Sequence, residues 1–169
     1  MRAGTRTAAT MAVLCLLLLG GAVWGWSALT APFPGKADAP ICENTAVKKG
    51  AKVFPTQVVV SVYNAGERAG LAGRTMTMLT DRGFREGESG NAPRGGKKVP
   101  VVQVWTTHPH NPAVQLVARQ LGPRHSVVKH KPLGAGVTVV VGDGFRGLGH
   151  KTRFVRARGN AEICSPPVE

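Results

Sequence analysis

The sequence predicts an α/β protein: a two-layer sandwich of two helices on one mixed sheet of four to five strands, preceded by a single transmembrane helix. Three observations carry this prediction. Short β-branched runs indicate buried strands, two segments repeat apolar residues at helical spacing, and one uncharged apolar segment lies near the N-terminus. A chain of 169 residues is long enough for one domain with a modest core.

Short β-branched or apolar runs bounded by turn residues predict the strands. These runs are Gln57–Tyr63, Phe84–Glu88, Val99–Thr106, Ser126–Lys129 and Val137–Val141. Pro100 indicates that the third strand begins late or lies at a sheet edge, because proline cannot donate a ladder hydrogen bond. Thr152–Val155 is either an edge strand or part of a tail that wraps back. Residues 41–55 give no clear pattern beyond a turn at Val47–Gly50.

Two segments have the spacing of amphipathic helices. The first runs from about Ala69 to Arg82 and is stopped by Gly83; its apolar stripe is Leu71, Ala72, Thr75, Met78 and Leu79. The second begins at Asn111, a capping residue followed by Pro112, and ends at Gly122. Its stripe is Ala113, Val114, Val117, Ala118 and Leu121. One stripe per helix covers one face of a sheet, which is the reason for predicting two layers.

The segment Ala8–Leu29 is uncharged and long enough to span a bilayer as a helix. Arg2 and Arg6 precede it, and the next basic residue is Lys36, so the positive-inside rule predicts a cytoplasmic N-terminus and an external remainder. A cleaved signal peptide is the alternative, with small residues at Ser27–Ala28 or Thr30–Ala31 as the cleavage site. Trp24 and Trp26 favour the uncleaved anchor, because paired aromatics suit a membrane interface better than a cleavage site.

The chain divides into five predicted parts. They are a cytoplasmic N-terminus (1–7), the transmembrane helix or signal peptide (8–29), an extracytoplasmic linker (30–55), the folded domain (56–145) and a basic C-terminal tail (146–169). Outside the cytoplasm, Cys42 and Cys164 form an even pair that flanks the domain, which predicts a disulfide that ties the tail back. Two independent thiols are the alternative. Cys15 lies inside the apolar run, where a small membrane-buried residue is its simplest interpretation.

The formal net charge is +13, which favours anionic partners. Location selects among them: an exported domain meets wall polymers and lipid headgroups rather than nucleic acid, and only 5% of residues are aromatic, too few to predict a base-stacking platform. The side chains predicted to contact an anionic polymer are the basic residues of one loop and of the tail. They are Lys97, Lys98, Arg146, Lys151, Arg153, Arg156 and Arg158.

Few sequence patterns indicate a catalytic, metal-binding or ligand-binding site. Asn64, Gly66 and Gly70 lie between a buried strand and a helix; they predict a structural turn, with anion or sugar binding by exposed N–H groups as the alternative. The spacing of His108, His110, His125 and His130 matches no ordinary zinc site, so we predict no metal and no cofactor. The sequence lacks the usual hydrolase signatures and has few acidic residues, which predicts a protein that is not an enzyme.

Several segments together resemble the LytR C-terminal domain family. The resemblance rests on Val58–Gly66 followed by Gly70–Ala72, then Leu79 with Gly83–Phe84, the helix Asn111–Leu121 and the segment Val137–Phe145. It implies a stand-alone, membrane-anchored envelope protein of the actinobacterial and Gram-positive type. Such proteins are associated with envelope integrity, and the family has no agreed catalytic residues to transfer to this chain.

These observations lead to one functional expectation and two alternatives. The expectation is a non-enzymatic envelope protein that binds an anionic cell-wall polymer, peptidoglycan or another envelope protein. The first alternative is an extracytoplasmic scaffold or regulator that contacts a wall-assembly enzyme. The second is an unrecognised wall hydrolase. No ligand and no oligomeric state follow from the sequence.

Overall fold

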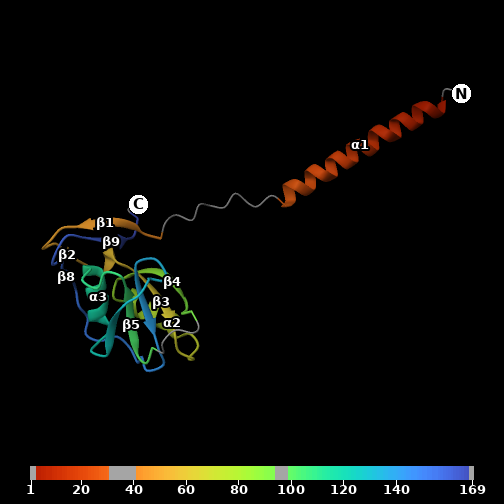
Figure 1. The fold of residues 1–169 in the computed structure, drawn as a ribbon. Coiled ribbons are helices and arrows are strands. Elements are labelled where there is room, and N and C mark those ends of the chain that lie inside the picture. Colours follow the sequence, from red (N-terminus) through yellow and green to blue (C-terminus); the bar gives the residue numbers. More distant parts are fainter. Residues whose placement is uncertain (1–2, 31–40, 94–98, 168–169) are drawn as a thin grey trace. The chain divides into compact units, whose positions relative to one another are not determined.

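The computed structural model describes residues 3–30, 41–93 and 99–167, and the chain divides into two units, Met1–Ala39 and Pro40–Glu169. In the first unit, α1 (Ala3–Thr30) contains the apolar stretch Ala9–Ser27, which has the length and composition of a membrane-spanning helix. A signal sequence has the same properties, so α1 by itself is consistent with both predicted interpretations. The predicted α/β sandwich lies in the second unit (Figure 1).

The central sheet has five strands and is mixed, as predicted. Their spatial order is β4 (Arg85–Asn91), β3 (Val59–Asn64), β7 (Val137–Val141), β5 (Val102–Thr106) and β6 (His125–Lys129). The parallel pairs are β3 with β4, β3 with β7, and β5 with β6, whereas β5 and β7 are antiparallel. Val102 lies opposite Val141, so the carboxyl ends of β5 and β7 lie at opposite ends of the sheet.

Both helices pack on one face of this sheet, so the two-layer prediction is confirmed. Alternate valines of β3, β5 and β7 share one core with α2 (Leu71–Thr80) and α3 (Pro112–Gln120). The predicted stripes lie in this core, although Met76 of α2 is buried where the prediction had Met78, which is half-buried. Such alternation is the expected consequence of the two-residue period of a strand.

The opposite face of the sheet is covered by the loop after β6. Trp105 and Val140 form a second small core there, against which Tyr63 and Leu133 pack. Ser61 Oγ donates to the Ala135 carbonyl, and a side chain at Gly136 (φ 70°) would collide with the carbonyl of Val59. Burial and a hydrogen bond to Glu88 raise the pKa of Tyr63 to about 12.

The ends of several predicted elements differ from the structure for local reasons. Residues Pro55–Gln57 form a 3-10 turn, so the first sheet strand begins at Val59. The segment Val99–Thr106 is extended only from Val102, in agreement with the position of Pro100. Helix α2 begins at Leu71 because Gly70, with φ 69°, is left-handed. The strand predicted to end at Glu88 continues to Asn91, where the sequence indicated a loop.

Residues before and after the predicted domain (56–145) also belong to the fold. Segment 41–55, assigned to a linker from the sequence, holds β1 (Glu43–Val47) and β2 (Lys52–Val53). The tail holds β8 (Val155–Arg156), which pairs with β2, and β9 (Ala161–Ser165), which pairs with β1. Val53, Val155 and Ile163 are buried in the main core. The domain therefore starts before residue 56 and uses the tail as structure.

The second unit carries its own core. Every buried residue in the described ranges lies within residues 53–165, and the two short ribbons and the five-stranded sheet all belong to residues 41–167. No apolar side chain of α1 among residues 9–27 is buried. Because a compact unit with a hydrophobic core of its own folds independently, residues 41–169 form a self-sufficient domain.

Candidate functional site

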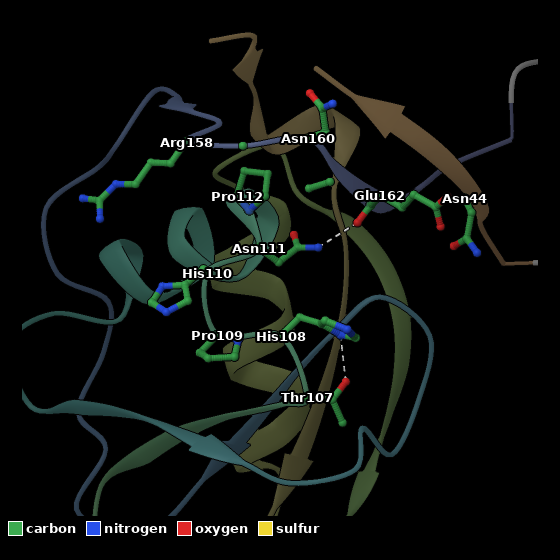
Figure 2. A pocket seen from close by; sticks show the side chains of 12 residues that line it. Asn44, Thr107, His108, Pro109, His110, Asn111, Pro112, Arg158, Asn160 and Glu162 are labelled. Atoms are coloured by element: carbon green, nitrogen blue, oxygen red, sulfur yellow. Dashed lines mark hydrogen bonds between the residues drawn. The ribbon is translucent and has the colours of Figure 1, made fainter. Parts of the chain in front are cut away.

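A cleft of about 640 Å³ opens where β5 ends and α3 begins. One wall is the segment Thr107–Pro112 and the other is the part of the tail from Arg158 to Glu162, with Asn44 of β1 at the rim. Figure 2 shows Arg158 and His110 on one side of Asn111, and Glu162 and Asn44 on the other. The lining combines polar side chains with the rings of Pro109 and Pro112, so the cleft suits a ligand that has both polar and apolar faces.

Asn111 joins the two walls of the cleft. Its Oδ1 accepts a hydrogen bond from the Ala113 N–H (2.9 Å), which caps α3 as the sequence predicted. Its Nδ2 donates to the Glu162 carbonyl (2.7 Å), seen as a dashed line in Figure 2. The cap was evident from the Asn-Pro pair, but the partner in β9 was not, because Glu162 is 51 residues away.

Thr107 and His108 form the only hydroxyl–imidazole contact among the described residues of the cleft, with 2.9 Å between Oγ1 and Nδ1. A nucleophilic hydroxyl needs a base that is itself oriented by a third group. In the described part of the cleft no carboxylate hydrogen-bonds to the His108 ring. The described residues also contain no cluster of three or more His, Cys, Asp or Glu side chains suited to a metal ion.

The tail runs back along α3 from one end of the helix to the other. At the carboxyl end of α3, Gln120 Nε2 donates to the Thr152 carbonyl (2.7 Å) and the Gln120 carbonyl accepts from the Gly149 N–H. At the amino end, Asn111 contacts Glu162. The tail therefore covers the length of α3, about 14 Å for nine residues.

This path places five of the predicted binding residues in a row, which we call the basic track. Its members, all exposed, are Arg146, Lys151, Arg153, Arg156 and Arg158. Residues 144–161 contain no Asp or Glu, and Arg158 ends the track at the cleft. Lys97 and Lys98, predicted to bind with them, lie outside the described residues.

Lysines from the segment before the sheet join the track, which the sequence did not indicate. Lys52 lies opposite Arg156 in the β2–β8 pair, and its Nζ is 4.7 Å from the centre of the Phe154 ring. The Lys49 N–H donates to Asn160 Oδ1, which holds the turn 48–50 beside the tail. The sequence showed a basic turn at Lys48–Lys49, but the pairing of β2 with β8 places it next to the tail, about 100 residues later.

The turn at Asn64, Gly66 and Gly70 is filled from within the chain. Asn64 Oδ1 accepts from the Gly66 N–H, and Asp143 Oδ1 accepts from the N–H groups of Glu67 and Arg68, each at 3.0 Å. A side chain at Gly66 would collide with Asp143. The N–H groups considered for anion binding thus already hold a carboxylate, so the arrangement favours the structural interpretation of this motif.

The charge of Asp143 makes the stability of the fold at this turn depend on pH. The backbone hydrogen bonds from Glu67 and Arg68 lower the pKa of Asp143 below its ordinary value. A lowered folded-state pKa adds stability above the unfolded-state value, about 4, and this stability is lost as pH falls through the folded-state value. Asp143→Asn keeps an acceptor but removes the charge. We expect the urea midpoint of the wild type to fall more steeply below about pH 4 than that of the variant; equal slopes would show that the charge contributes nothing.

Cys42 and Cys164 are joined by a disulfide with their Cα atoms 5.3 Å apart. The bond lies at the end of the β1–β9 ribbon, where Asn44 pairs with Cys164. It connects the segment that follows α1 in sequence to the last strand of the domain. Cys15, in α1, is a free cysteine.

Comparison with known proteins gives one family. The family model described as "LytR cell envelope-related transcriptional attenuator" matches residues 57–145, more than half of the chain. No curated protein matches the chain in sequence. Among solved structures, the soluble domain of a conserved hypothetical secreted protein from Mycobacterium marinum is similar, with 20% identity and a TM-score of 0.48, over 66% of this chain and 78% of that one.

Proposed function

The chain belongs to the LytR C-terminal domain family, and on this premise we propose that it is a non-enzymatic, membrane-anchored extracytoplasmic protein that supports the cell envelope by binding an anionic wall polymer or peptidoglycan. The observation that carries the proposal is the basic track. A row of exposed cations without intervening acids is complementary to a linear polymer whose negative charges repeat along its length. The cleft at the end of the track, with polar side chains beside two proline rings, offers a place for a sugar unit, which carries hydroxyl groups and apolar C–H faces.

The location forms part of the proposal. Helix α1 is long and apolar enough to anchor the chain, and Arg2 and Arg6 favour a cytoplasmic N-terminus and a single crossing. The disulfide supports an oxidising compartment for the domain, since such bonds are rare in the cytosol. Residues 1–7 would then lie inside the cell, residues 8–29 in the membrane, and the domain outside.

Charge reversal on the track tests polymer binding. We expect the triple change Arg153→Glu, Arg156→Glu and Arg158→Glu to weaken sedimentation of residues 41–169 with purified cell walls by at least about 100-fold. This estimate takes about 1 kcal/mol, or fivefold, for each basic side chain near an anionic surface. Arg85→Glu, Lys129→Glu and Lys131→Glu together form the matched control, because they change the net charge equally on exposed residues that are not part of the track and do not line the cleft.

The outcome of this comparison is decisive for the track. Unchanged sedimentation of the track variant, or an equal loss in the control, would show that the track does not bind the wall. Loss of turbidity when the domain meets isolated walls would instead support a hydrolase and contradict the non-enzymatic proposal.

A scaffold that contacts a wall-assembly enzyme is the second candidate, favoured by the edge of β1. In the described part of the chain this strand pairs only with β9, and its residues 43–46 are exposed, so its other edge is open to strand addition. Salt distinguishes the two functions. At 1 M salt the Debye length is about 3 Å, so binding through the track is lost while strand pairing persists.

A further inference from the structure

A second cavity, of about 380 Å³, lies between α2 and the segment that follows β7. Arginines and apolar side chains share its lining, which consists of Arg68, Leu71, Arg74, Thr77, Met78, Phe145 and Arg146. We call it the arginine groove. Because it follows the carboxyl end of β7, it lies at the opposite end of the sheet from the cleft, which follows the carboxyl end of β5.

The apolar part of the groove comes from one face of α2. Leu71, Arg74 and Met78 are spaced i, i+3 and i+7, so they lie in one row along the helix. Phe145, which is buried, continues this surface from the other side, and Met78 is half-buried. Leu71 and Phe145 thus lie beneath the groove, and Met78 is the apolar side chain that the groove exposes in part.

The cationic part is held in place by the backbone. Arg68 Nη1 donates to the carbonyls of Asp143 (3.0 Å) and Phe145 (3.2 Å), and Arg74 Nη2 donates to the Ala69 carbonyl. Within the described residues, no carboxylate forms an ion pair with Arg74 or Arg146. The Asp143 carboxylate accepts from backbone N–H groups of the turn and also attracts the charge of Arg68. The guanidinium groups of Arg74 and Arg146 are thus available to an external anion.

An anion with an apolar body fits this combination better than a sugar polymer or a free phosphate. Guanidinium groups bind phosphate oxygens, and the partly exposed Met78, above Leu71 and Phe145, offers an apolar contact for hydrocarbon. We propose that the arginine groove binds an acidic phospholipid of the membrane that holds α1. This rests on the proposed location, because the anchor keeps the domain close to a bilayer surface.

The arginine groove and the cleft are separate sites within the domain. The basic track connects the two ends, from Arg146 at the groove to Arg158 at the cleft. The wall polymer and the phospholipid would then bind at opposite ends of the sheet.

Vesicle binding of residues 41–169, which carry their own core, tests the groove. We expect binding to vesicles that contain phosphatidylglycerol and little binding to phosphatidylcholine alone. Arg74→Glu removes two units of charge and should weaken the binding about 25-fold, at about fivefold per unit. Met78→Gln, similar in shape, should weaken it severalfold, because it replaces apolar contact without changing charge. Arg85→Glu is the charge-matched control, because it makes the same change on an exposed residue outside the groove. It should weaken vesicle binding much less than Arg74→Glu does.

Several results would overturn the proposal. These are equal binding to both kinds of vesicle, equal losses in Arg74→Glu and Arg85→Glu, or full binding by Met78→Gln. Displacement from the vesicles by millimolar inorganic phosphate would also overturn it, by reducing the groove to a phosphate site. Arg74 lies in the first turns of α2, where an acidic residue favours the helix, so Arg74→Glu should fold. Wall sedimentation of Arg74→Glu should persist, which separates failure of the groove from failure of the track.

Discussion

Replacing both Cys42 and Cys164 by serine is expected to lower the free energy of unfolding of residues 41–169 by about 2–5 kcal/mol. The bond closes a loop of 122 positions, so its loss frees a long segment of the unfolded chain. The change should begin at the ribbon, because β1 is mostly exposed and pairs only with β9 among the described strands. Urea unfolding measures the loss in the free energy of unfolding, and hydrogen exchange identifies the segment that opens first.

Two controls define the result. Reduced and alkylated wild type should match the double variant, whereas Cys15→Ser in the full chain should leave the stability of the domain unchanged. We expect faster exchange first in residues 43–47. The Ser165 hydroxyl, which donates to the Gln57 carbonyl (2.8 Å), and buried Ile163 should keep the end of β9 in place. Identical unfolding curves with and without the disulfide would show that the bond contributes nothing to the fold.

Replacing Gln120 by leucine is expected to cost about 2–4 kcal/mol, although the two side chains are similar in size. Gln120 is 0% exposed, accepts from Arg82 Nη1 (2.6 Å) and donates to the Thr152 carbonyl. Leucine would leave the Arg82 guanidinium and the Thr152 carbonyl without these hydrogen bonds, in a partly buried position. Burial already lowers the pKa of Arg82, so the loss of an acceptor there is costly.

The same substitution should also release the tail. Gln120 holds Thr152, and Arg82 Nη2 donates to the Gly149 carbonyl, so the segment 149–152 depends on this network. Hydrogen exchange should rise there before it rises in the central sheet, and wall binding through the track should weaken. Arg119→Leu is the matched control, because it changes the neighbouring exposed residue of α3. If Gln120→Leu were as stable as this control, the network would not support the tail.

The candidate sites depend on contacts that no local pattern announces. The basic residues of the tail were predicted one by one, but their arrangement in a row follows from the contacts of Gln120 and Asn111 with the tail. Asp143 is an ordinary turn residue in the sequence, whereas in the structure its carboxylate fills the turn at Gly66, 77 residues away. The arginine groove needs Arg74 and Arg146 from two distant segments. None of these pairings has a fixed spacing along the chain.

By itself the sequence determined the features that depend on near neighbours. The β-branched run Val137–Val141 specified a buried strand, Asn111 and Pro112 specified the start of α3, and the uncharged segment 8–29 specified a helix able to cross a membrane. Only the tertiary structure decided the strand order, the β1–β9 and β2–β8 ribbons and the course of the tail. The physical reason is that hydrophobic period and capping act within a few residues. A buried amide such as Gln120, by contrast, is satisfied by whichever distant backbone group the packing brings to it.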